Sequence, residues 1–185
     1  MSTIIREIRA GDWEQVRRMR LDALLDPAAA VAFLETHEQA AAKPDEFWRT
    51  RAANASEGAA SARQFVAETE DGRWLGTITA IVELPGGDGA IEGDVIEAPQ
   101  IHLVGVYVRP EARGAGLLQE LVGAASAWAW SLSEPEIGRV RLFVHEDNTR
   151  AEAAYVKAGF AVTGLRLPVP GDATRQEVEM EVLRG

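Results

Sequence analysis

The chain has 185 residues, of which 46% are apolar and 26% charged, and 19 Lys and Arg against 29 Asp and Glu give it a formal charge of −10. This length and balance are typical of one folded domain, which we predict to span residues 1–185. The acidic excess argues against a nucleic-acid binder, which needs a basic face for the phosphates, and the absence of cysteine excludes disulfides, thiolate zinc sites and cysteine nucleophiles.

The start of the chain does not have the pattern of a signal peptide, because charged residues interrupt the apolar ones within the first nine positions. The longest apolar stretch, residues 28–34, is far shorter than the ~20 residues of a membrane span. We therefore expect a cytoplasmic protein with neither a membrane nor a nucleic acid as its partner.

The N-terminal half predicts one strand, two helices and a hairpin. Residues 4–8 resemble an edge strand, and apolar residues recur at helical spacing from Trp13 until Pro27. A second helix is expected from Asp45, as its cap, to about Asn54, whereas the conformation of residues 28–42 is left open. Two β-rich runs, 65–67 and 74–82, are joined by Asp71-Gly72, which is a hairpin signal.

The C-terminal half alternates strands with helices after a Gly- and Pro-rich loop over residues 84–99. The nearly continuous apolar run 101–108 is typical of a buried central strand. An amphipathic helix is expected over 117–132, a strand over 140–144, a helix over 148–158 and a strand pair over 161–167 and 177–183. A hairpin followed by this alternation predicts an α/β (α+β) fold with a mixed sheet.

The segment with the most chemical information is Arg109-Pro110-Glu111-Ala112-Arg113-Gly114-Ala115-Gly116, between the central strand and the helix at Leu117. Such a turn directs unpaired N–H groups and the positive end of a helix dipole at one point. We predict an anion site, with a pyrophosphate as the best candidate. The segment has no Gly-Lys-Ser/Thr triplet for a Walker loop, and Gln119 stands where a Rossmann fingerprint needs glycine. The alternative is that Gly114 and Gly116 only shape a tight turn between the strand and the helix.

Two blocks of the chain resemble the conserved blocks of the GCN5-related N-acetyltransferase (GNAT) family. Arg113 and Gly116 match the family's acetyl-CoA-binding pattern Gln/Arg-x-x-Gly-x-Gly/Ala, although Leu118 occupies the last, small position. Residues 142–160, with Asn148 and Tyr155, resemble the second block. The resemblance implies a mixed, mostly antiparallel central sheet of six or seven strands, flanked by about four helices.

The resemblance also implies acetyl-CoA as co-substrate, no metal, and direct attack on the thioester by a primary amine of a small molecule or peptide. The cofactor contacts would be Val106, Val108, Arg113, Gly114, Ala115, Gly116, Leu117, Leu118 and Asn148. The family places an oxyanion-stabilising N–H at Val106 and the general acid at Tyr155. Helix capping by Asn148 and plain packing of Tyr155 on its helix are the structural alternatives.

The general base is less determined by the sequence. At pH 7, deprotonating an alkyl amine whose pKa is about 10.4 requires roughly 4–5 kcal/mol. His102, on the predicted central strand, suits the role of base because the unperturbed pKa of histidine is about 6.5. A purely structural role, in which the ring makes one hydrogen bond within the fold, explains the residue equally well. Glu83, Glu92 and Glu97 are rivals. The acidic 84–99 loop would attract a cationic amine, unless it is only a solvated loop.

Two other functions stay open at this point. One is a non-catalytic acyl-CoA-binding sensor or interaction module, and the other is a transferase of a different short acyl group. A homodimer is the assembly that we keep open for the chain.

Overall fold

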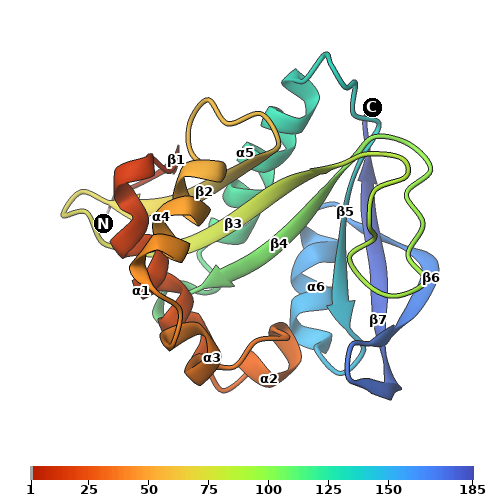
Figure 1. Cartoon of the computed structure of the whole chain (residues 1–185), viewed down its shortest axis with the longest axis horizontal. Helices are drawn as coiled ribbons and strands as arrows, with labels where there is room; N and C mark the ends of the chain where they lie inside the picture. Colours follow the sequence, from red (N-terminus) through yellow and green to blue (C-terminus); the bar gives the residue numbers. More distant parts are fainter. Residues whose placement is uncertain (1) are drawn as a thin grey trace.

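The computed structural model describes residues 2–185, whose strands form one seven-stranded sheet with helices on both faces (Figure 1). The sheet order is β1-β2-β3-β4-β5-β7-β6. The strands are β1 (Thr3–Glu7), β2 (Ala62–Thr69), β3 (Trp74–Glu83), β4 (Gln100–Val108), β5 (Arg139–His145), β6 (Ala161–Val169) and β7 (Asp172–Leu183). Every neighbouring pair is antiparallel except β4 and β5. The predicted mixed, mostly antiparallel sheet is therefore confirmed.

The described residues form six α-helices, two more than the expected number. They are α1 (Trp13–Leu24), α2 (Ala29–Ala32), α3 (His37–Ala41), α4 (Asp45–Asn54), α5 (Leu117–Ser131) and α6 (Thr149–Lys157). The extra two, α2 and α3, lie in the stretch left open by the sequence, because one turn is too short to display a period. The predicted cap of α4 is wrong by one position, since Pro44 precedes the helix and Asp45 is its first residue. None of these helices is long and apolar enough to cross a membrane.

Two apolar cores lie on the two faces of the sheet. Ile101 and Leu103 of β4 pack in the core beneath α5, whereas Tyr107 belongs to the core beneath α1 and α4. A bulge at Gly105 explains the switch of faces, because β3 residues Thr77 and Thr79 pair with Tyr107 and Val104. Gly105 has φ +59°, which favours glycine. The bulge thus sets which side chains of β4 face each helix layer.

The two parallel strands at the centre of the sheet separate along their length. β4 pairs with β5 only at Ile101–Val140 and His102–Arg141, and the strands then diverge, as Figure 1 shows for green β4 and teal β5. Beyond His102, the edge of β4 that faces β5 has no strand partner among residues 2–185. This opening lies beside the turn that leads into α5 and determines where a ligand can enter.

A buried ion cluster holds the 84–99 loop against the face of the sheet opposite α5. Arg141 of β5 is fully buried and donates to Glu83 at 2.7 Å, Asp94 at 2.6 Å and Glu179 at 3.0 Å. Burial alone would raise the pKa of Asp94, but the hydrogen bonds from Arg141 keep that pKa below its usual value. The loop is therefore anchored to the sheet by charge.

Candidate active site

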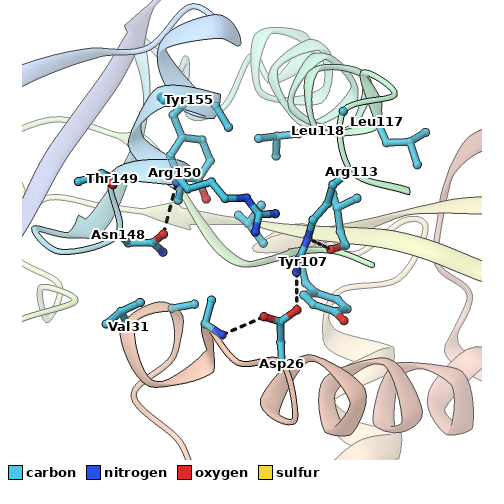
Figure 2. A pocket seen from close by; sticks show the side chains of 18 of the residues that line it. Asp26, Val31, Tyr107, Arg113, Leu117, Leu118, Asn148, Thr149, Arg150 and Tyr155 are labelled. Atoms are coloured by element: carbon cyan, nitrogen blue, oxygen red, sulfur yellow. Dashed lines mark hydrogen bonds and ion pairs between the residues drawn. The ribbon is translucent and has the colours of Figure 1, made fainter. Parts of the chain in front are cut away.

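A cavity of about 770 Å³ lies where β4 and β5 diverge (Figure 2). Its wall is formed by the α1–α2 segment, the end of β4, the start of α5 and one face of α6. Ligand-binding pockets in proteins typically have volumes of roughly 300–1,000 Å³. The cavity is thus large enough for an extended, nucleotide-sized ligand.

The turn before α5 offers five consecutive backbone N–H groups, at residues 114–118. No acceptor among residues 2–185 pairs with any of them, and Gly116 caps the helix with no side-chain hydrogen bond. Gly114 and Gly116 have φ of +82° and +84°, and a Cβ at either would meet nothing within 4 Å. The backbone angle, not crowding, is therefore what requires glycine here. Free amides at the start of a 15-residue helix suit an anion.

The free edge of β4 offers further main-chain groups. Arg109 N–H donates to Leu75 of β3 at 2.8 Å, and successive N–H groups of a strand point in opposite directions. The N–H groups of Val108 and Val106 therefore point toward the side from which β5 has diverged. Both residues line the cavity.

The two arginines of the segment before α5, Arg109 and Arg113, already have partners in the protein. Arg109 donates to the Trp74 carbonyl at 2.7 Å and to Asp22 at 2.6 Å, and it is not in the cavity wall. Arg113 is in the wall, where it forms an ion pair with Asp26 and donates to the Val108 carbonyl at 2.8 Å. Arg113 thus joins the α1–α2 segment to the turn, and most of its charge is neutralised.

A further cation, which the sequence patterns did not single out, is Arg150 in the first turn of α6. Figure 2 shows its guanidinium extending into the cavity, and no ion pair or side-chain hydrogen bond joins it to residues 2–185. A basic residue in the first helical turn opposes the helix dipole. That unfavourable placement is the signal by which the sequence could have identified Arg150.

Asn148 and Tyr155 of the second block both line the cavity. The Asn148 side-chain oxygen caps α6 by accepting from the Ala151 N–H at 3.3 Å. Tyr155 packs edge-on against Phe160, with ring centroids 6.0 Å apart. Its hydroxyl points into the cavity (Figure 2) and bonds to no residue from 2 to 185. Burial raises the pKa of Tyr155 above its usual value, so the phenol stays protonated at neutral pH.

Leu117 and Leu118 have different surroundings. Both line the cavity, but Leu117 is buried in the core beneath α5 at 7% exposure, whereas Leu118 is half-buried. The small residue of the family pattern is thus replaced by a larger apolar side chain in the cavity wall, labelled in Figure 2.

The structure does not bring His102 to the cavity. Its Nδ1 lies 3.0 Å from Glu83 Oε1 in the buried ion cluster, and its ring packs edge-on against Phe143. Val106 is four positions further along the strand, or about 13 Å away. Glu83 is engaged in the same cluster, and Glu92 and Glu97 are exposed on the loop. Of the predicted cofactor residues, Ala115 alone does not line the cavity.

The chain is similar to known proteins both in sequence and in fold. The sequence model of the Acetyltransferase (GNAT) family matches residues 13–160. No curated protein matches the chain.

Among solved structures, Arabidopsis thaliana NAA60 in complex with acetyl-CoA is 18% identical, with 98% of each chain covered and a TM-score of 0.69. A GCN5-related N-acetyltransferase from Kribbella flavida is 20% identical, with 98% of each chain covered and a TM-score of 0.68. Vibrio cholerae spermidine N-acetyltransferase in complex with CoA and spermine is 16% identical, with 98% of this chain and 95% of that chain covered and a TM-score of 0.61. At these identities the structures show a shared fold.

Proposed function

The chain belongs to the acetyltransferase (GNAT) family, and on that premise we propose that it acetylates a primary amine of a small molecule or peptide with acetyl-CoA. The observation that carries the proposal is the row of five unpaired N–H groups at 114–118, beside the free edge of β4. The similar Arabidopsis and Vibrio structures contain acetyl-CoA and CoA, which supports the same ligand here.

The cavity residues fit the parts of acetyl-CoA. The amides of residues 114–118 would hold the pyrophosphate, with Arg150, which has no ion pair among residues 2–185, as a cation beside it. The unpaired edge of β4 would receive the pantetheine arm as an added strand, with Val108 as one donor. Bound in this way, acetyl-CoA supplies a thioester whose carbonyl carbon forms the new C–N bond as the C–S bond breaks.

Two groups of the chain would then assist the transfer. The Val106 N–H is fixed toward the opening and would stabilise negative charge on the thioester oxygen, a contribution typically worth about 3 kcal/mol of barrier. The Tyr155 hydroxyl, protonated and free of partners among the described residues, would donate to the departing sulfur. The proton lost by the amine goes to water or to a base.

The role of His102 as that base stays a prediction, and its position in the ion cluster favours a structural role. We expect His102→Gln to leave kcat within about threefold, because the ring does not reach the cavity, and to lower the melting temperature, because the Glu83 contact is lost. Thiol release and thermal denaturation are the two measurements. A loss of turnover by about two orders of magnitude or more, without destabilisation, would instead support the base role.

The binding site can be tested at Gly116. We expect Gly116→Glu to weaken acetyl-CoA binding about 30- to 100-fold, equivalent to a loss of roughly 2–3 kcal/mol. A carboxylate would repel the pyrophosphate, and φ of +84° disfavours any side chain. Isothermal titration calorimetry measures the Kd.

Gly58→Glu is the matched control for that substitution. Gly58 has nearly the same φ, +85°, and lies exposed outside the cavity wall. The control should bind acetyl-CoA like the unchanged protein. Equal Kd values for both variants would disprove the anion site.

A further inference from the structure

A second, smaller cavity lies beneath α1, on the face of the sheet opposite α5. It is bounded by α1, α4 and strands β2 to β4. Phe33 and Tyr107 belong to the walls of both cavities, so the two adjoin. Gly105, the residue before Val106, is also in the smaller wall. This cavity is therefore next to the point where the acetyl carbonyl is proposed to lie.

The charge of this smaller cavity is opposite to that of the protein as a whole. Within the part of the chain that the structure describes, its wall contains two arginines, Arg20 and Arg51, and no carboxylate. The whole chain carries −10. A local excess of positive charge next to the proposed reaction point indicates an anionic ligand group.

Only one of the two arginines has a carboxylate partner. Arg20 donates through Nε to Glu35 at 3.1 Å, and Glu35 also pairs with Lys43. No ion pair or side-chain hydrogen bond joins Arg51 to any residue from 2 to 185, although Arg51 is partly buried. Burial and the nearby Arg20 guanidinium lower the pKa of Arg51, and the Glu35 carboxylate offsets only part of this effect. A bound anion would add a counter-charge and offset the repulsion from Arg20.

The other polar groups in the wall are neutral. The Gln64 amide donates to Thr77 Oγ1 at 2.9 Å, whereas the Thr79 hydroxyl has no partner among the described residues and remains available as a donor. A planar guanidinium matches a carboxylate with two parallel hydrogen bonds. Among the described residues of this wall, Arg51 is the one guanidinium without a partner, which suits the single charge of a carboxylate.

We propose that Arg51, assisted by Arg20, binds a carboxylate of the acceptor, so that the acetylated substrate is a small amino acid carrying both a primary amine and a carboxylate. The proposal rests on the proposed acetyltransferase function and specifies its substrate class. With the carboxylate held at Arg51, the amine of a small acceptor lies toward Gly105 and Val106. This inference differs from attraction of a purely cationic amine by the acidic 84–99 loop, which joins β3 and β4 at the other end of these strands.

The test compares acceptors that differ only in the carboxylate. Thiol release from acetyl-CoA is measured with the twenty standard L-amino acids, with the corresponding L-amino acid amides, and with spermidine. We expect at least one amino acid to be acetylated with a kcat/KM about 100-fold above that of its amide, because a site built for a charged hydrogen bond rejects an analogue lacking it.

Two variants assign that preference to the cavity. Arg51→Gln should lower kcat/KM for the preferred amino acid about 30- to 100-fold, mainly through KM, and leave the value for the amide and the Kd for acetyl-CoA unchanged. Arg51→Lys, which retains the charge, should restore part of the activity. Arg18→Gln is the matched control, because Arg18 is exposed on α1 and does not line the smaller cavity. This variant should behave like the unchanged protein.

The outcomes separate this inference from the proposed function. Preferential acetylation of amides or spermidine, or equal losses for acid and amide in Arg51→Gln, would overturn the carboxylate site and leave the acetyltransferase intact. Binding of acetyl-CoA with no thiol release for any amine would overturn the proposed function, and this inference with it.

Discussion

Replacing Tyr155 with phenylalanine is expected to lower kcat about 100-fold or more while the Kd for acetyl-CoA stays within about twofold. The substitution removes only the hydroxyl, which points into the cavity without a partner among residues 2–185, and keeps the packing against Phe160. The pKa of the Tyr155 phenol is raised, whereas the pKa of a thiol is about 8.5, so complete transfer of the phenol proton to the thiolate is unfavourable. The hydroxyl therefore contributes a hydrogen bond to the negative charge that develops on sulfur. Steady-state thiol release and calorimetry provide the two values.

The pH profile adds a control for the Tyr155 assignment. Because burial raises the pKa of Tyr155 above its usual value, the hydroxyl remains protonated throughout the assay range, and no loss of turnover between pH 7 and about 9 should be attributable to it. The profiles of the protein and of Tyr155→Phe should therefore run parallel over that range. Full activity of the variant, at any pH, would remove Tyr155 from the mechanism.

Replacing Arg141 with methionine is expected to destabilise the fold by about 3–5 kcal/mol. Arg141 is fully buried and is the common partner of Glu83, Asp94 and Glu179. Its removal would leave three buried carboxylates without their main counter-charge. The free energy of unfolding in urea measures the loss, and the melting temperature should fall by roughly 6–20 °C.

Arg139→Met is the matched control for that experiment. Arg139 contacts Glu179 and Glu181 from two positions earlier in β5 but has 28% of its side chain exposed, so the cost should be about 1 kcal/mol or less. If Arg141→Met and Arg139→Met lower the free energy of unfolding equally, the buried cluster is not what holds the 84–99 loop against the sheet.

Acid should weaken the same cluster. Burial alone would raise the pKa of Asp94 and Glu179, but hydrogen bonds, including those from Arg141, keep both below their usual values. Carboxyls with lowered pKa values contribute stability above their unfolded pKa of ~4 and lose it as the pH falls through the folded pKa. We expect unfolding free energy to be steady from pH 7 to about 5 and to decrease below about 4, less steeply in Arg141→Met.

Much of the fold could be predicted because its elements are long enough to show a period. The stripe of α5 spans its 15 residues, and Asp71-Gly72 marks the β2–β3 hairpin. The one-turn helices α2 and α3 carry no such signal. The divergence of β4 from β5 was equally hidden, since it depends on which strands pair beyond His102 and not on their composition.

The site shows the same division. The turn at 114–118, Asn148 and Tyr155 were found because their chemistry is local or their spacing matches a family pattern. The Arg113–Asp26 pair and the cluster around His102 depend on contacts between residues distant in sequence. A lone histidine on a central strand looks the same whether it faces a ligand or an ion cluster, so sequence could not separate the two.

The most direct test of the proposed anion site is a crystal structure of the chain grown with acetyl-CoA. We expect the pyrophosphate within hydrogen-bond distance of the amides of residues 114–118, and the thioester oxygen within reach of the Val106 N–H. A pyrophosphate bound elsewhere on the surface, or an empty cavity at a saturating concentration of acetyl-CoA, would contradict the proposed site.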